Sequence, residues 1–448
     1  MKKGRFARLS QAVLAIVVAA TILVGVAAFP QAQASAYETS GITLRDDITV
    51  NYKDYVDSSV MFELPDTVRS SDEISVIITV DVPNLMDAYN GTDKAMSFAD
   101  YALHSNEAAE LEAQMQAEKA RILSQLDEMG ICYTAGEDYT RLLSGFEIRI
   151  QASDFTAVTQ SLGEGEGTVI GEEYAVAETQ LVENTVNIYE TGIFKSGESG
   201  YDGTGMVVAV LDTGLDSNHS AFSVDNFTSD HLGLTYADVA AVLDQTQAYA
   251  LSEGLTVDDV YINEKVPFGY DYADNDPDPY STHNNHGTHV SGVIVGKDDT
   301  ITGVAPNAQL VAMKTFSDIM DTARSTWILA ALEDCVVLGV DVINMSLGTA
   351  AGFSRESDEE ILNGVYDKIR EAGISIVVAA SNSYSSAYGS EANGNLPLTS
   401  NPDTGTVGSP GTYAGTLSIA SINGEETPYL LFDKTIIYFD ESNTGASE

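Results

Sequence analysis

Five short apolar segments between residues 206 and 422 alternate with helical patterns, and this alternation constrains the fold of the chain most strongly. The predicted strands cover residues 206–212, 309–313, 340–345, 374–381 and 416–422. They are almost continuously apolar, as expected of strands that are buried on both faces. Strands that alternate with helices form a parallel, doubly wound sheet, so the sequence predicts an α/β fold.

Polar residues stand at the ends of three of these segments. Asp212 ends the first segment, Ser346 follows the third, and Asn382 follows the fourth. The carboxyl ends of parallel strands lie along one edge of the sheet, and ligands of such sheets bind there. We therefore expect these three side chains to gather at one functional edge.

A smaller domain is predicted upstream, over residues 71–180. Strands are predicted at residues 74–80, 146–150 and 169–176, where β-branched or alternating apolar residues dominate. One helix is predicted to begin near Ser105 and stop at Gly130, and another to run from Ser153 to residue 162. The order β-α-β-β-α-β indicates a small α+β, ferredoxin-like domain.

The first 36 residues are predicted to be a secretory signal peptide. Four basic residues precede an apolar run over residues 12–29, and a small-x-small cleavage site follows at residues 34–36. An uncleaved membrane anchor is the alternative, because the run is long enough to span a bilayer. Residues 37–70 are predicted to be a polar linker.

The net charge limits the classes of partner. It is −46 at pH 7, and nucleic acid is excluded as a partner because binding phosphates requires Lys and Arg. The charge is compatible with a structural Ca²⁺ ion or a cationic substrate, and equally with a solvated acidic surface. No other cofactor is predicted. The two cysteines, Cys132 and Cys335, fall in different predicted domains and are too few for a disulfide framework.

Asp212 and His286 are the two most telling candidate residues. Asp212 ends an apolar strand, and His286 opens an apolar helical stretch within the sequence His-Gly-Thr-His. A buried carboxylate can hold an imidazole in one tautomer, and the imidazole can then accept the proton of a serine hydroxyl. The pair therefore supplies two thirds of a nucleophilic triad.

Two further strand ends have chemistry that fits such a site. The side-chain amide of Asn382 can donate a hydrogen bond to an oxyanion. The extended segment of Ser346, Leu347 and Gly348 can pair with a peptide backbone by strand addition.

Four blocks resemble the signature blocks of the subtilisin-like serine peptidases, and they occur in the order of that family. They are Val-Leu-Asp-Thr-Gly at 210–214, His-Gly-Thr-His-Val-Ser-Gly at 286–292, Gly-Val-Ala-Pro at 303–306 and Val-Ile-Asn-Met-Ser-Leu-Gly at 342–348. The block at 286–292 is highly specific, whereas Asp-Thr-Gly alone also occurs in aspartic proteases.

The resemblance implies a secreted serine endopeptidase whose catalytic domain covers residues 185–423. It implies Asp212 as the orienting acid, His286 as the general base and Asn382 as the oxyanion donor, with residues 346–348 lining the substrate cleft. The domain at 71–180 is then similar to the family's propeptide, which assists folding, inhibits the enzyme and is cleaved off. The secretion signal and the long gap between Asp212 and His286 are similar to features of the large cell-envelope subtilases of Gram-positive bacteria. These imply protein or peptide substrates, and cell-wall attachment through a region beyond residue 448.

The sequence departs from the family pattern at two places. Where the family usually has Gly before the oxyanion Asn, this chain has Ser381, whose β-carbon stiffens the backbone. The Gly-Thr-Ser-Met-Ala block with the nucleophile is missing; Ser447 is the nearest match, and Ser409 is predicted to be a turn residue. Residues 424–448 are predicted to begin an inserted protease-associated domain. The serine would then lie outside this chain, and the chain alone would be inactive.

Other interpretations remain open. The chain is alternatively a non-catalytic pseudoprotease that binds peptides through residues 346–348, or an unrelated doubly wound binding protein. A zinc site at His283, His286 and His289 has compatible spacing but lacks the Glu of the H-E-x-x-H motif. The acidic loop at residues 271–278 is either solvated or binds a metal or a cationic side chain.

Overall fold

The computed structural model describes residues 69–92, 96–171, 173–176, 201–227, 231–252, 254–320, 322–349, 356–382, 407–420, 429–432 and 435–438. Every described residue lies within one compact unit, residues 62–448. The predicted signal peptide, almost all of the linker, and Ser447 lie outside the described residues. Among the described residues, no helix combines the length and apolar character needed to cross a bilayer.

Residues 69–171, here called the N-terminal unit, form an antiparallel sheet with the strand order β2-β3-β1-β4. The strands are β1 (Glu73–Thr79), β2 (Tyr133–Tyr139), β3 (Gly145–Gln151) and β4 (Gly167–Ile170), and the helices are α2 (Leu85–Asn90), α3 (Phe98–His104), α4 (Asn106–Met129) and α5 (Phe155–Ser161). This order is that of a ferredoxin-like unit with two added short helices.

Helix α4 shows why the sequence pattern was informative. The Ser105 hydroxyl accepts hydrogen bonds from the first N–H groups of the helix, and Gly130 ends it with φ of 72°. The intervening apolar residues pack with the sheet, because they recur on one face. Those fully covered are Ala108, Met115, Ile122 and Leu126.

Two strands of this region differ from the sequence prediction. Strand β2 was not located, because its sequence, Tyr-Thr-Ala-Gly-Glu-Asp-Tyr, carries few β-branched or apolar residues. The single strand predicted at 169–176 is wrong. The chain forms β4 and then a separate strand, β5 (Glu173–Val176), which belongs to a different sheet with the order β11-β5-β9.

The larger part of the chain is built on a six-stranded sheet with the order β13-β12-β10-β6-β8-β7. Every neighbouring pair is parallel, which confirms the doubly wound α/β fold. The strands are β6 (Val207–Asp212), β7 (Phe268–Asp271), β8 (Gln309–Lys314), β10 (Val342–Met345), β12 (Ser375–Ala379) and β13 (Thr416–Ile419). The sequence predicted all of them except β7, which is only four residues long.

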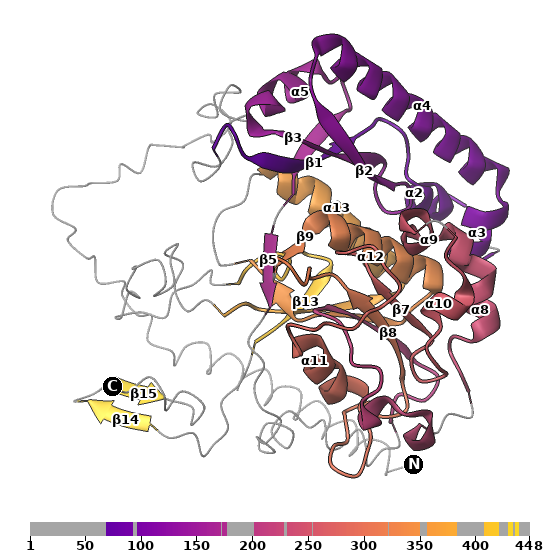
Figure 1. The fold of residues 1–448 in the computed structure, drawn as a ribbon, viewed down its shortest axis with the longest axis vertical. Coiled ribbons are helices and arrows are strands. Elements are labelled where there is room, and N and C mark those ends of the chain that lie inside the picture. The colour runs from indigo at the N-terminus through magenta and orange to yellow at the C-terminus, as the bar shows by residue number, and fades with distance from the viewer. Residues whose placement is uncertain are drawn as a thin grey trace, which may run out of the picture. The chain divides into compact units, whose positions relative to one another are not determined.

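Helices cover both faces of this sheet (Figure 1). Helix α11 (His286–Val295) lies on one face, where it shares a core with Val208 and Val210 of β6. Helices α12 (Ser325–Leu338) and α13 (Glu356–Glu371) lie on the other face, between this sheet and the sheet of the N-terminal unit. Their core is continuous with that of the N-terminal unit, since Tyr139 and Leu142 belong to the same cluster as Leu211.

The remaining short elements lie in connections. They are α8 (Tyr236–Val242), α9 (Gln247–Leu251), α10 (Val257–Val260), β9 (Ala323–Arg324), β11 (Leu347–Gly348), β14 (Tyr429–Phe432) and β15 (Thr435–Tyr438). Strands β14 and β15 pair antiparallel in the region where the first strands of an insert are predicted. Both cysteines are free, and Cys335 is buried in α12.

Candidate active site

Asp212 and His286 are joined at the carboxyl edge of the parallel sheet. Asp212 is the last residue of β6 and His286 the first of α11, and the Nδ1 of His286 lies 2.6 Å from the Oδ1 of Asp212. Asp212 is 1% exposed and His286 is 8% exposed. The same Oδ1 accepts the backbone N–H of Thr213 at 2.7 Å. The carboxylate is therefore held by the turn that follows its strand, and it fixes one nitrogen of the imidazole.

The residues next to His286 explain why α11 approaches β6 so closely. A β-carbon on Gly287 would lie 2.4 Å from the carbonyl oxygen of Gly214, so only glycine fits there. The Gly287 N–H donates to the Thr213 hydroxyl at 2.9 Å, and the Thr288 hydroxyl accepts the Asp216 N–H at 2.8 Å. The Gly and Thr of the His-Gly-Thr-His block thus fasten the helix to the Asp-Thr-Gly turn.

Strand β5 belongs to a small three-stranded sheet, apart from the six-stranded one. It lies between β11 and β9 and runs antiparallel to both, with Val176 opposite Leu347 and Tyr174 opposite Ala323. Leu347 and Gly348 thus pair with a strand of the chain itself, and the binding of a substrate by residues 346–348 stays a prediction. Ser346 precedes the pair, and its hydroxyl accepts a hydrogen bond from Asn344 at 3.1 Å.

Tyr174 of β5 inserts its ring between helices α12 and α13. It is 2% exposed, and it contacts a pocket of mainly apolar side chains. The lining residues are Ser325, Ile328, Leu329, Leu332, Leu362, Val365 and Tyr366. Burial of a ring of this size contributes about 2 kcal/mol, so Tyr174 anchors β5 against α12 and α13.

Asn382 lies at the end of β12 and points to the same strand. Its side-chain amide donates to the carbonyl oxygen of Val176 at 3.4 Å. Ser381, just before it, has φ of 103°, which lies in the region that favours glycine. The departure from the family pattern thus falls on a backbone conformation that suits the usual glycine.

We expect Ser381→Gly to raise the free energy of unfolding by about 1 kcal/mol. Replacing a non-glycine residue in a left-handed backbone conformation relieves roughly 1–3 kcal/mol of strain. Glycine has greater conformational freedom in the unfolded chain, and this offsets part of the stabilisation. Chemical denaturation of the two proteins measures the difference. A destabilised Ser381→Gly protein would contradict the strain at this position.

Glu333 was missed by the sequence analysis, and it joins the N-terminal unit to α12. Its Oε1 accepts the backbone N–H groups of Arg141 and Leu142 at 2.8 and 3.0 Å. Its Oε2 accepts from Gln247 at 2.7 Å, and the Gln247 amide also donates to the Asp138 carbonyl. Burial raises the pKa of Glu333, and the charge of Arg141 opposes the rise. An acidic pair within the apolar run 327–338 was the available signal.

Ser409 and the possible zinc site are the remaining candidates from the sequence. The Ser409 N–H donates to the Thr349 hydroxyl at 3.0 Å, in a turn that precedes the cis peptide bond to Pro410. The described residues contain no cluster of three or more His, Cys, Asp or Glu side chains suited to a metal, so His283, His286 and His289 do not form one.

The acidic loop is only partly solvated. Asp271 is buried, and Asp271 and Asp274 both contact the ammonium of Lys314. Of the options left open by the sequence, binding of a cationic side chain therefore applies to these two residues. Asp276 and Asp278 are exposed and accept backbone N–H groups of the loop itself.

The sequence matches the subtilase family over residues 203–443, and the chain belongs to this family. It is similar to the PIII-type proteinase of Lactococcus lactis subsp. cremoris (strain SK11), with 30% identity over 78% of this chain and 17% of that protein. It is also similar to the C5a peptidase of Streptococcus pyogenes serotype M18, with 33% identity over 50% of this chain and 19% of that protein. The chain thus spans less than a fifth of the length of these relatives.

Among solved structures, the chain is similar to fervidolysin from Fervidobacterium pennivorans, a keratinolytic enzyme related to subtilisin. The two share 15% identity, with a TM-score of 0.43, over 84% of this chain and 46% of that chain.

Proposed function

We propose that this chain is the N-terminal part of a secreted or cell-envelope serine endopeptidase of a Gram-positive bacterium. The observation that carries the proposal is the buried contact of 2.6 Å between Asp212 and His286, and the pairing of β11 with an extended segment of the chain itself supports it. Family membership and the bacterial proteinases named above support it. Its substrates are proposed to be proteins or peptides.

The proposed mechanism assigns one step to each residue. The hydrogen bond from Nδ1 to Asp212 sets the tautomer in which Nε2 carries the lone pair. His286 then accepts the proton of a serine hydroxyl as its oxygen attacks the substrate carbonyl, and later gives that proton to the leaving amine. The Asn382 amide donates to the oxyanion that forms. The serine is proposed to belong to a longer gene product, since the matched part of this chain covers less than a fifth of each of these relatives.

The N-terminal unit is proposed to be an inhibitory propeptide. Strand β5 continues from this unit into the cleft, and the carbonyl that accepts from Asn382 is that of Val176. A carbonyl in this position is the one that becomes the oxyanion. We therefore assign the processing bond to Val176–Ala177.

The test uses a gene product that includes a Gly-Thr-Ser-x-Ala-x-Pro block. We expect mass spectrometry to find a new N-terminus at Ala177, and none when His286 is replaced by alanine. The present 448 residues alone are expected not to react with a fluorophosphonate probe. Cleavage elsewhere would refute the assigned bond, and labelling of a serine in this chain would refute the proposed source of the nucleophile.

A pseudoprotease is the second candidate, and one observation favours it. The 448 residues contain no Gly-Thr-Ser-Met-Ala block, whereas the peptide-binding edge at β11 is formed. An extended gene product without such a block, which binds peptides and cuts none, would support this alternative.

A further inference from the structure

Lys314 lies in a row of charges directly beside the candidate acid. Asp212, Lys314 and Asp271 are paired in register across β6, β8 and β7. Paired residues of parallel strands point to the same face, so the three side chains share the face that α11 covers. Lys314 is 0% exposed, which makes its ammonium a wholly buried charge.

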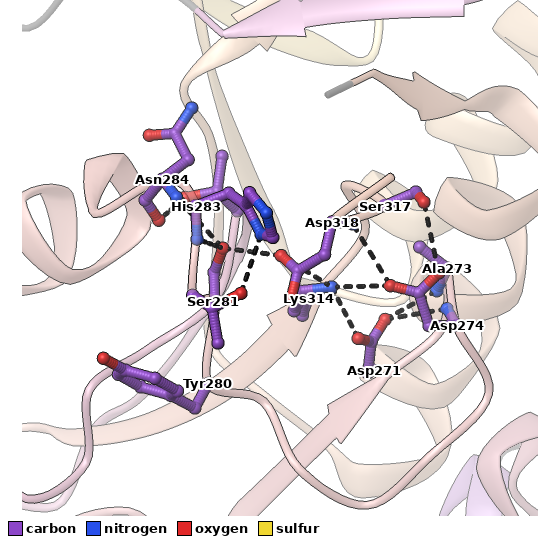
Figure 2. A network of polar contacts seen from close by, with 12 residues as sticks. Asp271, Ala273, Asp274, Tyr280, Ser281, His283, Asn284, Lys314, Ser317 and Asp318 are labelled. Atoms are coloured by element: carbon purple, nitrogen blue, oxygen red, sulfur yellow. Dashed lines mark hydrogen bonds and ion pairs between the residues drawn. The ribbon is translucent and has the colours of Figure 1, made fainter. Parts of the chain in front are cut away.

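Three carboxylates surround this ammonium (Figure 2). The Nζ of Lys314 lies 2.5 Å from Asp271, 3.2 Å from Asp274 and 3.7 Å from Asp318. Burial lowers the pKa of Lys314, but the contacts with Asp271 and Asp274 outweigh it, so the pKa is raised and the ammonium stays charged. A buried ammonium is tolerated only when it is paired in this way.

A chain of hydrogen bonds leads from this cluster to the backbone of His286. The Ser281 hydroxyl donates to Asp318 at 2.7 Å and accepts the N–H groups of His283 and Asn284 at 3.3 and 3.2 Å. The side-chain oxygen of Asn284 in turn accepts the backbone N–H of His286 at 3.0 Å. Figure 2 shows Ser281 between the cluster and the segment that precedes the helix.

The same cluster also binds the segment that leads to strand β9. Asp274 accepts the Ser317 hydroxyl at 3.1 Å and the Asp318 N–H at 3.2 Å. From there the chain returns through a bridge between Phe316 and Ala323 into β9, which pairs with β5. One ammonium therefore contacts both the loop before His286 and the loop before an edge strand of the cleft.

We propose that Lys314 is a positioning residue: its buried ammonium ties the loop that precedes His286 to the segment that leads into β9. The inference deepens the proposed function and rests on it for its catalytic meaning. Neutralising Lys314 leaves the carboxylates of Asp271, Asp274 and Asp318 to repel one another. Both loops then separate, and the imidazole loses its fixed orientation toward Asp212.

The decisive experiment compares three variants of the 448-residue chain. Lys314→Met removes the ammonium, and Ser281→Ala keeps the ion pairs but removes the hydroxyl that links them to His286. Lys265→Met is the matched control. Lys265 is equally buried, at 1% exposure, but its Nζ donates to the backbone carbonyls of Pro306 and Ala308.

Two measurements report how firmly His286 is held, and neither requires catalytic turnover. We expect hydrogen exchange of the amides at residues 284–287 to be at least ~10-fold faster in Lys314→Met and Ser281→Ala, because their anchoring bond is lost. We also expect the Nδ1–H resonance of His286 to broaden in both. In Lys265→Met, the exchange and the resonance should match the parent chain. Equal behaviour of Ser281→Ala and the control would overturn the proposal, even where Lys314→Met fails to fold.

A kinetic readout in a serine-containing product separates positioning from folding. We expect kcat per titrated active site to fall roughly 10–100-fold in Ser281→Ala, as small misplacements of a catalytic group cost this much. A role in folding alone would lower only the number of active sites. Because the exchange and resonance measurements stand without catalysis, an inactive protein would refute the proposed function and leave this inference testable.

Discussion

Replacing His286 by alanine is expected to lower kcat/KM for peptide hydrolysis by about 10⁴–10⁶-fold in a gene product that includes the serine block. The imidazole is the proposed proton acceptor, and its contact of 2.6 Å with Asp212 is buried. Removal of either partner disables the pair as a unit. The measurement is steady-state hydrolysis of a chromogenic peptide, with circular dichroism to establish that the variant is folded.

His289→Ala is the matched control for this prediction. His289 lies in the same turn of α11, only partly buried, and its backbone N–H makes the ordinary helical bond to the Asn285 carbonyl. We expect its replacement to change kcat/KM by less than ~10-fold. Asp212→Asn should lose about 10⁴-fold, because the amide favours the wrong tautomer. A folded His286→Ala protein with substantial turnover would show that another residue is the base.

Replacing Glu333 by alanine is expected to loosen the N-terminal unit from α12 by about 2–4 kcal/mol, or roughly 30- to 1000-fold. The change leaves the N–H groups of Arg141 and Leu142 and the amide of Gln247 without their acceptor. Each unsatisfied buried donor costs about 1–3 kcal/mol. Hydrogen exchange of peptides from 139–144 and 173–176 measures the loosening, since both segments are held by the docked arrangement.

Glu333→Gln is the control, because an amide oxygen can still accept both backbone N–H groups. We expect an intermediate loss, since the new NH₂ group would face the Gln247 amide. Unchanged protection in Glu333→Ala would mean that the carboxylate does not hold the two parts together.

The same contact predicts a pH dependence. Burial raises the pKa of Glu333 above its ordinary value of 4.5, and separation from the N-terminal unit exposes the group and lets its pKa fall back. The docked state therefore binds the proton more tightly. Docking is strongest below the ordinary pKa and weakens as the pH rises through the raised one. Hydrogen exchange measured at several pH values and corrected for intrinsic rates should show that docking in the parent chain weakens as the pH rises. The Glu333→Gln chain should lack this trend.

Much of the central fold was predictable because each strand carries its own signal. Strands β6 and β8 are buried on both faces, and a strand buried on both sides permits little else than a nearly continuous apolar run. Strands β10, β12 and β13 are less completely buried, but each is still a short run rich in apolar residues. The site pair was predictable for a related reason. Asp212 and His286 stand where a strand ends and a helix begins, and such ends meet at one edge of a parallel sheet.

The missed elements lack a local signal. Strand β7 has four residues, and β2 contains Gly, Glu and Asp, so neither stands out from a loop. Strand β5 was joined to β4 in one prediction, because the pattern across residues 167–176 does not show where the chain changes sheets. Its partners, β9 and β11, lie about 150 or more residues further along the chain.

The sequence alone determined the parallel sheet, the family blocks and the identity of the candidate acid and base, since these depend on periodicity and on short motifs. Only the tertiary structure decided that β5 pairs with β11, that Glu333 accepts a backbone N–H of the N-terminal unit and that Lys314 pairs with Asp271. The reason is physical. A charged residue in an apolar run is costly until distant parts of the chain supply its partners, and the sequence does not name those partners.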